Sequence, residues 1–305
     1  MLDFINISLD MKKDIDKYYL AYGEGSCQHS FISNFCLKSK YNDMFCEQDD
    51  ILYIKRLGLC TDIYDVFLFP MCDKSNINNV KLAILNIIDT THKNGKKVRF
   101  ETITDTSYNF LSKYFDNLFK FTDCRNYYEY IYSIDKISEL KGSLYQSKRN
   151  SINKLFKQYG DKLVVKKIEN IDLDFIKKFY YEWTNKKESK DDDYNNDDEK
   201  EAFNLILQNY FIFDLVGIVV YIDDNVIGFN IGSKISNYTY DGMIQKGNDK
   251  YDGIYPLLNK ETAKEYINEF RYLNFEEDLG IDGLRNSKLM YHPDNLIKKY
   301  IATEA

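Results

Sequence analysis

The sequence predicts an α/β protein of the α+β type, in two halves that each form a mixed, mostly antiparallel sheet flanked by helices. Apolar residues recur with helical spacing in some segments and alternate with strand spacing in others. The same order of segments (helices, antiparallel strands, a helix and one more strand) occurs twice along 305 residues, a length that accommodates two domains. We therefore expect domains at 1–135 and 136–305, although no sequence repeat relates them.

The first half alternates helical and extended segments. Its clearest helix is 77–95, because Val80 and Ile84 share one face and Gly95 follows the last turn. In chain order, we expect helices at 11–22, 30–41, 77–95 and 105–115, and strands at 44–48, 50–58, 64–70, 97–103 and 126–134.

The second half begins with a long basic helix that ends at Gly160. An acidic stretch at 188–201 is expected to be an exposed loop. In chain order, we expect helices at 141–160, 172–187, 202–214, 256–270 and 282–291, and strands at 162–168, 215–223, 225–235, 237–245 and 272–277.

Composition and charge exclude several classes of protein. The net charge of −7 argues against generic nucleic-acid binding, although nine Lys and Arg residues face two acids between residues 136 and 167. No run approaches the ~20 apolar residues of a membrane span and no signal peptide is present, so a cytoplasmic location is expected. All six Cys lie in the first 124 residues without a Cys-x-x-Cys pair, which is typical of reduced thiols. No metal site is predicted, because the three His are not spaced as ligands.

One face of the basic helix has the composition of an anion-binding surface. Lys and Arg side chains at helical spacing can hold phosphates through charge-assisted hydrogen bonds. The residues of this face are Lys141, Tyr145, Lys148, Arg149 and Asn150. The alternative is a solvated helix face with no ligand, which is the more common origin of such a charge run.

A glycine-containing loop before the helix 256–270 is a second candidate anion site. Backbone N–H groups at a helix N-terminus bind phosphate well. Acetyl-CoA enzymes with this arrangement usually carry [QR]-x-x-G-x-[GA], and the nearest match here is Lys250-x-x-Gly253-x-Tyr255. Because Tyr255 would crowd a pyrophosphate, Gly253 could equally serve only the turn.

Charged residues gather after the last expected strand. The strand 237–245 is expected to splay from 272–277 and leave a notch for an acyl group, with acids at its mouth and two cations on the following helix. These residues are Glu276, Glu277, Asp278, Arg285 and Lys288. Glu276 or Asp278 could accept the proton of a nucleophile, and Arg285 or Lys288 could stabilise the developing oxyanion. An ion-pair cluster that fixes the last helix is the alternative.

Two segments carry a family resemblance. "KGSLYQSKRNSINKL" at 141–155 and "LNFEEDLGIDGLRNSKLMYHP" at 273–293 resemble the C-terminal domain of phosphatidylglycerol lysyltransferases, and the soluble proteins grouped as DUF2156. "HSFISNFCLKSKYN" at 29–42 extends the resemblance over nearly the whole chain, although Cys36 stands where Trp is common.

The resemblance implies two tandem GNAT-like (acyl-CoA N-acyltransferase) domains, with the acyl-transfer site in the second. Relatives move an aminoacyl group from charged tRNA to a lipid head group. Carried over by motif, Lys148, Arg149 and Asn150 would face the donor, and Tyr291 joins the catalytic candidates.

The expected function is therefore acyl transfer from aminoacyl-tRNA or acyl-CoA to an amine or hydroxyl acceptor, with no tightly bound cofactor. The acceptor and the oligomeric state stay open. The full lysyltransferases carry a membrane-embedded domain that this sequence lacks, so a small soluble amine or a protein is considered as acceptor beside a lipid. The alternatives are a catalytically silent tandem-GNAT binding module, an acetyl-CoA-dependent N-acetyltransferase of a small molecule, and a tRNA-binding protein without transfer.

Overall fold

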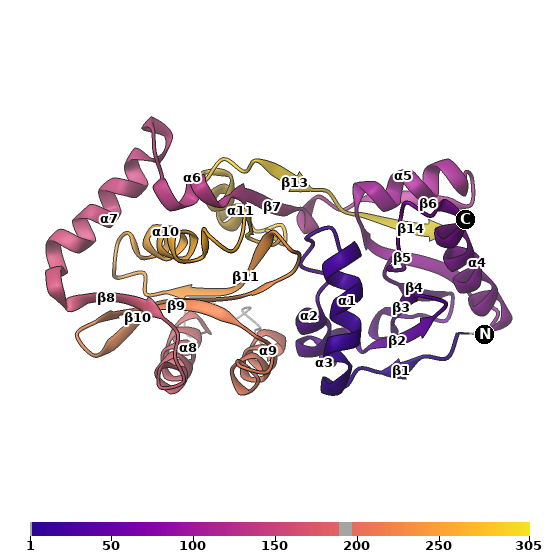
Figure 1. The fold of residues 1–305 in the computed structure, drawn as a ribbon, viewed down its shortest axis with the longest axis horizontal. Helices are drawn as coiled ribbons and strands as arrows, with labels where there is room; N and C mark the ends of the chain where they lie inside the picture. The colour runs from indigo at the N-terminus through magenta and orange to yellow at the C-terminus, as the bar shows by residue number, and fades with distance from the viewer. Residues whose placement is uncertain (1, 189–196) are drawn as a thin grey trace.

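The protein contains two seven-stranded sheets with helices on their faces (Figure 1). The structure is a computed structural model that describes residues 2–188 and 197–305. Both sheets are mixed and mostly antiparallel: in the described parts of the chain, β4 with β5 and β11 with β12 are the parallel neighbours. The predicted fold class is confirmed.

The first sheet is formed mainly by the N-terminal half. Its strands, in spatial order, are β1 (Ile5–Asn6), β2 (Asp43–Gln48), β3 (Ile51–Arg56), β4 (Tyr64–Phe67), β5 (Lys97–Ile103), β14 (Tyr300–Glu304) and β6 (Phe119–Asp123).

The second sheet is formed mainly by the C-terminal half. Its strands, in spatial order, are β13 (Asn295–Ile297), β7 (Glu129–Ser133), β12 (Tyr272–Asn274), β11 (Thr239–Gly247), β10 (Asn225–Lys234), β9 (Val216–Ile222) and β8 (Leu163–Lys167).

Each sheet takes one strand from the other half of the chain. β7 was expected to end the first half, but it pairs with β12 and β13 in the second sheet. β14, which the sequence did not suggest, returns to the first sheet and lies between β5 and β6, as the yellow strand among the purple ones in Figure 1 shows. Alternation of apolar residues identifies a strand but not its partners, so the assignment of 126–134 to the first sheet was wrong. The division of the chain into two domains at residue 135 stays a prediction.

The helices form layers outside and between the sheets (Figure 1). One buried cluster joins the first sheet to α4 and α5, and a second joins the second sheet to α6, α7 and α10. A third, between the sheets, contains residues of α1, α2, α8 and α9 and so packs the two halves together. The helices are α1 (Lys12–Tyr22), α2 (Phe31–Cys36), α3 (Lys38–Tyr41), α4 (Ile77–Lys93), α5 (Asp105–Tyr114), α6 (Ile134–Glu139), α7 (Gln146–Tyr159), α8 (Asp172–Glu188), α9 (Asp197–Gln208), α10 (Ile254–Tyr266) and α11 (Asp282–Leu289).

The two halves repeat one topology. In the first, β2, β3 and β4 are antiparallel, and α4 crosses over to β5, which is parallel to β4. In the second, β9, β10 and β11 are antiparallel, and α10 crosses over to β12, which is parallel to β11. This repeat is the tandem arrangement that the order of elements predicted.

Several element boundaries differ from expectation, among them the end of β12, which stops at Asn274, and the starts of α7 and α9. The basic helix α7 begins at Gln146, because Gly142 adopts a left-handed φ of 87° and a single 3-10 turn follows it. α9 begins at Asp197 and has three acidic residues in its first turn, where negative side chains interact favourably with the helix dipole. Residues 197–201 are therefore helical and do not belong to the expected loop. The expected loop at 189–196 lies outside the described residues. No described helix is both long and apolar enough to cross a bilayer.

Candidate acyl-transfer site

A cavity opens where two parallel strands diverge. β11 and β12 pair from Thr239↔Tyr272 to Asp241↔Asn274, after which β12 ends and β11 continues to Gly247. The space beyond the last pair is a cavity of about 590 Å³. Its lining comes from β11, the segment after β12, and helices α8, α9, α10 and α11, and includes Trp183, Gly242, Gln245, Tyr255, Asn259, Phe275, Glu276, Ser287, Lys288 and Tyr291.

Glu276 lines this cavity in a strained backbone conformation. Its φ is 55°, in the left-handed region that few residues other than glycine adopt, and such strain is frequent at functional sites. The conformation is held by the Glu276 amide, which donates to Asn274 Oδ1 at 2.8 Å. Burial raises the pKa of Glu276 well above its ordinary value.

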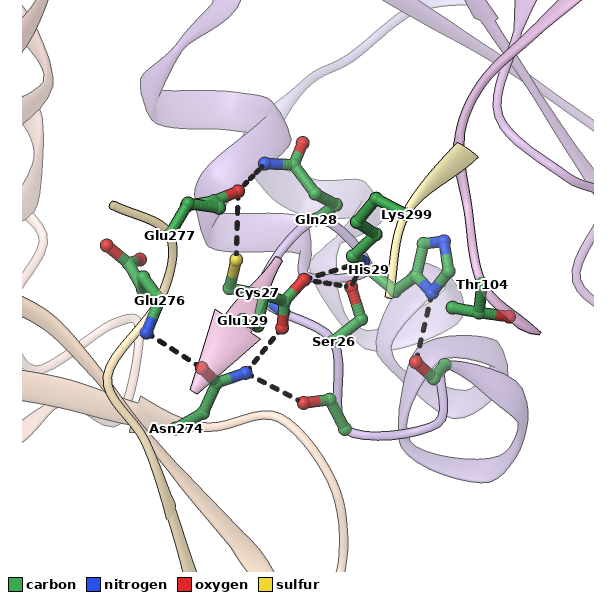
Figure 2. A network of polar contacts seen from close by, with 12 residues as sticks. Ser26, Cys27, Gln28, His29, Thr104, Glu129, Asn274, Glu276, Glu277 and Lys299 are labelled. Atoms are coloured by element: carbon green, nitrogen blue, oxygen red, sulfur yellow. Dashed lines mark hydrogen bonds and ion pairs between the residues drawn. The ribbon is translucent and has the colours of Figure 1, made fainter. Parts of the chain in front are cut away.

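A buried polar network supports Glu276 from below (Figure 2). Asn274 Nδ2 donates to the Gly25 carbonyl at 3.0 Å and to Glu129 Oε2 at 2.5 Å. Lys299 Nζ lies 2.6 Å from Glu129 Oε1, and both side chains are fully buried. Burial alone would raise the pKa of Glu129, but the Lys299 ammonium and the hydrogen bonds from Ser26 and Asn274 together outweigh it and lower that pKa. The network ties β7 to the segment before β14, at the place where the chain passes between the two sheets.

Glu277 faces the first half of the chain, away from the cavity lining. Its Oε1 accepts from Gln28 Nε2 at 2.6 Å, and the Cys27 thiol lies 3.6 Å away (Figure 2). Cys27, Glu129 and Glu277 place one possible ligand atom each within 4.8 Å of one another. Lys299, Asn274 and other donors already bind the Glu129 carboxylate, so we do not assign a metal to these three residues. The expectation from the sequence that the protein has no metal site stays a prediction.

Lys288 reaches the cavity from α11. Its ammonium donates to the Glu277 carbonyl, and it is among the lining residues together with Glu276. Burial lowers the pKa of Lys288, although the nearby carboxylates of Glu276 and Glu277 act in the opposite direction.

Asp278 and Arg285 belong to an ion-pair cluster beside the cavity. Arg285 donates to both Asp278 oxygens at 2.8 and 2.9 Å, and Arg125 and Tyr130 donate to Oδ2 at 2.9 and 2.6 Å. Burial would raise the pKa of Asp278, but these hydrogen bonds outweigh it and hold that pKa well below its usual range. Neither Asp278 nor Arg285 lines the cavity.

Within the part of the chain that the structure describes, no residue of the basic helix or of the turn before it lines the cavity, and Tyr145 and Lys148 contact the cavity wall from behind. Tyr145 donates from its hydroxyl to the Tyr291 carbonyl at 2.9 Å, and the Lys148 ammonium lies 3.9 Å from the centre of the Tyr291 ring. Burial lowers the pKa of Lys148. Because Tyr291 lines the cavity, these two residues support its wall.

The remaining residues of the predicted anion-binding face lie apart from the cavity. Lys141 is exposed and pairs with Glu139 at 2.6 Å. Arg149 donates to the carbonyls of Leu140 and Gly142, and Asn150 is exposed.

The loop before α10 is closely packed. Gly253 has a φ of 97°, and a Cβ there would lie 2.6 Å from the Ser151 carbonyl oxygen, so the loop's contact with α7 requires glycine. The amides of Lys250 and Tyr251 both donate to Asn248, within the loop itself. Tyr255 donates from its hydroxyl to Gly247 and forms one wall of the cavity without filling it. Tyr240 is fully buried in the core and is not exposed to the cavity.

A second cavity adjoins the first. It measures about 470 Å³ and lies between α8, the turn from β9 to β10, and the loop before α10. Trp183 and Lys187 line both cavities. This second cavity, called the outer cavity below, is also lined by Phe175, Lys178, Lys186, Lys250 and Tyr251, together with three acids, Glu182, Asp224 and Asp249.

Several residues at the site were not among the predicted ones. Asp241 lies at the point of divergence, and the Glu129–Lys299 pair lies beneath it. An aspartate inside the apolar strand 237–245 was the available signal for Asp241. Glu129 and Lys299 are far apart in sequence, and nothing local indicates that they meet.

Comparison with known proteins agrees with this fold. An uncharacterized protein of Mycoplasmoides gallisepticum (strain R(low / passage 15 / clone 2)) is 28% identical over 172 residues, which are 56% of this chain and 54% of the relative. The chain thus matches about half the length of that curated relative. A solved protein of unknown function from Bacteroides thetaiotaomicron VPI-5482 superposes over 100% of both chains, with a TM-score of 0.92 and 26% identity. L-PGS from Bacillus licheniformis shares the fold, with a TM-score of 0.62 and 14% identity over 96% of this chain and 91% of that one.

The repeated topology, with a cavity between β11 and β12, defines a tandem GNAT-like fold. Residues 21–303 match the family model described as phosphatidylglycerol lysyltransferase, C-terminal. The chain belongs to this family, as the motifs at 141–155 and 273–293 indicated.

Proposed function

We propose that the protein transfers an aminoacyl or acyl group, from aminoacyl-tRNA or acyl-CoA, to an amine or hydroxyl acceptor in the cavity between β11 and β12. One observation carries this proposal: the open cavity has a carboxyl group in a strained backbone, Glu276, and an ammonium group, Lys288, in the same lining. A silent module has no need to keep either group at an open cavity.

The two groups fit the two requirements of acyl transfer. The acceptor's nitrogen or oxygen attacks the acyl carbon, and Glu276 accepts the proton that this atom loses. The Lys288 ammonium stabilises the negative charge that develops on the acyl oxygen. The bond from the acyl carbon to the ribose oxygen of tRNA, or to the sulfur of CoA, then breaks, and the proton on Glu276 passes to that leaving atom.

The other predicted catalytic residues fit supporting roles better. Asp278 is occupied by Arg285, Arg125 and Tyr130 and its pKa is lowered, so we assign it to anchoring α11. Tyr291 is buried, and burial raises the pKa of its phenol, so it stays neutral and forms the cavity wall.

The loop before α10 favours aminoacyl-tRNA over acyl-CoA as the donor. A pyrophosphate needs free backbone amides there, whereas the amides of Lys250 and Tyr251 are used inside the loop. We place the nucleotide end of the donor in the outer cavity, where Lys178 and Lys250 offer positive charge and Trp183 an aromatic ring.

A transfer assay tests the proposal. Aminoacyl-tRNAs, each charged with one labelled amino acid, and labelled acetyl-CoA are supplied separately with phosphatidylglycerol vesicles or a mixture of soluble primary amines. We expect the wild type to give a labelled product from an aminoacyl-tRNA, and Glu276→Gln to reduce its rate by at least about 100-fold. Glu265→Gln, which changes an exposed acid of α10 paired with Lys167, is the matched control and should transfer normally. Equal rates for all three proteins would contradict the proposal, and so would no transfer from any donor.

A further inference from the structure

Asp241 is a buried acid without a partner. It is fully buried, and neither of its carboxylate oxygens has a hydrogen-bond partner among the described residues. It lies on the same face of β11 as Thr239, against which Gly25 packs. This face points toward the loop that contains Cys27, between the two halves of the protein.

The groups around Asp241 do not balance in charge. Four carboxyl groups and two ammonium groups gather there from five elements, while the Cys27 thiol is neutral because burial raises its pKa. The carboxyl groups are Glu129 of β7, Asp241 of β11, and Glu276 and Glu277 after β12; the ammonium groups are Lys288 of α11 and Lys299 before β14. Full ionisation would leave a net charge of −2 in a buried cluster, which is very costly in a low dielectric.

The hydrogen bonds show which carboxyl groups are stabilised as anions. Glu129 accepts from Lys299, Ser26, Asn274 and the Cys27 amide. Glu277 accepts from Gln28. Asp241 accepts from nothing described, and Lys288 donates to a carbonyl instead of a carboxylate.

We infer that Asp241 is a positioning residue that keeps its proton in the folded protein. Because Asp241 is then a neutral neighbour, Glu276 is the carboxyl group that gives up and takes back a proton at the cavity. A protonated carboxyl carries no charge, so the buried side chain lacks the large cost of an unpaired anion. The direction of its pKa agrees: burial raises it, and Glu129 and Glu277 raise it further. The role of Glu276 rests on the proposed function, whereas the proton on Asp241 does not.

The pH dependence of unfolding measures this proton directly. The pKa of Asp241 is raised in the folded state, so above pH 4 the unfolded chain loses a proton that the folded protein retains. Stability is therefore lost as pH rises, until the folded pKa is passed. Between pH 5 and 7, we expect the ratio of unfolding constants, wild type over Asp241→Asn, to rise about tenfold per pH unit. Glu276→Gln should show a dependence of the same sign, because its pKa is raised as well.

Asp172→Asn is the matched control. Asp172 is also buried, but Lys166, Tyr221 and the Glu169 amide bind its carboxylate and lower its pKa. This variant should change the unfolding constant by the same factor at pH 5 and pH 7.

An infrared spectrum at pH 7 gives a second measurement. The wild type should absorb in the carbonyl region of protonated carboxyl groups, and Asp241→Asn should lose one component of this absorption. If Asp241→Asn does not fold, Asp241→Ala serves in both experiments. A pH-independent ratio, or a band unchanged by substitution, would overturn the inference. Neither experiment uses transfer activity, so a failed transfer assay with a pH-dependent ratio would refute the proposed function alone.

Discussion

Glu276 combines a left-handed backbone conformation with a buried carboxyl group that has other acidic residues nearby. Its left-handed φ of 55° is stabilised by Asn274, which the Glu129–Lys299 pair holds in turn. The raised pKa of Glu276 follows mainly from its burial. A raised pKa makes a carboxylate a stronger base near neutral pH.

At this scale we predict the pH dependence of transfer. Because Glu276 must be ionised to accept a proton and its pKa is raised, the rate should increase with pH along an ionisation clearly above the ordinary carboxyl range near 4.5. Rates measured from pH 5 to 9 under donor-limited conditions would show this. A rate independent of pH over that interval would remove Glu276 as the base.

Part of the cavity lining could be named from the sequence. Glu276, Lys288 and Tyr291 were predicted and line the cavity, since the motif at 273–293 places them there. The sequence could not separate Glu276 from Asp278, because their difference lies in the partners Arg125 and Tyr130, which come from residues more than a hundred positions away.

At the scale of elements, α11 depends on the Asp278 cluster. This short helix has no buried residues of its own, so the ion pairs with Arg285 and Arg125 hold it beside β7.

We predict that Asp278→Asn destabilises the protein by about 3 kcal/mol at pH 7, because it breaks a buried charge cluster and leaves two guanidinium groups unmatched. The pKa of Asp278 is lowered, so its contribution is present above the unfolded pKa near 4 and is lost as pH falls through the folded pKa. Urea unfolding at pH 7 and at pH 3 measures this. An equal difference at both pH values would contradict the assignment.

The loop before α10 gives a second prediction at this scale. Gly253→Ala should cost about 2 kcal/mol, because its φ of 97° and the close Ser151 carbonyl exclude a Cβ. Gly283→Ala is the control: a Cβ at Gly283 meets nothing within 4 Å, and Ala is the better helix former. Urea unfolding of both variants measures the difference, and similar stabilities for the two would show that the loop can move away from α7.

The whole molecule is joined by exchanged strands. Most elements could be predicted from periodicity, but β14 is short and has no local signal of its central position between β5 and β6. The cluster between the sheets, with α1 and α2 on one side and α8 and α9 on the other, also depends on packing that one sequence cannot indicate.

We predict that neither 1–135 nor 136–305 folds alone. The first piece would lack β14 and the second would lack β7, each a strand inside a sheet, and the missing strand would leave backbone groups and apolar surface unpaired. Circular dichroism with thermal unfolding measures this. A cooperative transition in either isolated piece would show that its sheet is complete without the exchanged strand.

The central claim is that the cavity between β11 and β12 holds the acyl group of the donor. The most direct test is an experimental structure with a hydrolysis-resistant aminoacyl-adenosine amide, and a parallel one with a CoA thioether. We predict that the aminoacyl carbonyl lies in the cavity within hydrogen-bond distance of Lys288, with Glu276 facing the reacting carbon and the adenosine beyond Trp183. Binding of the analogue elsewhere, with this cavity unchanged, would contradict it.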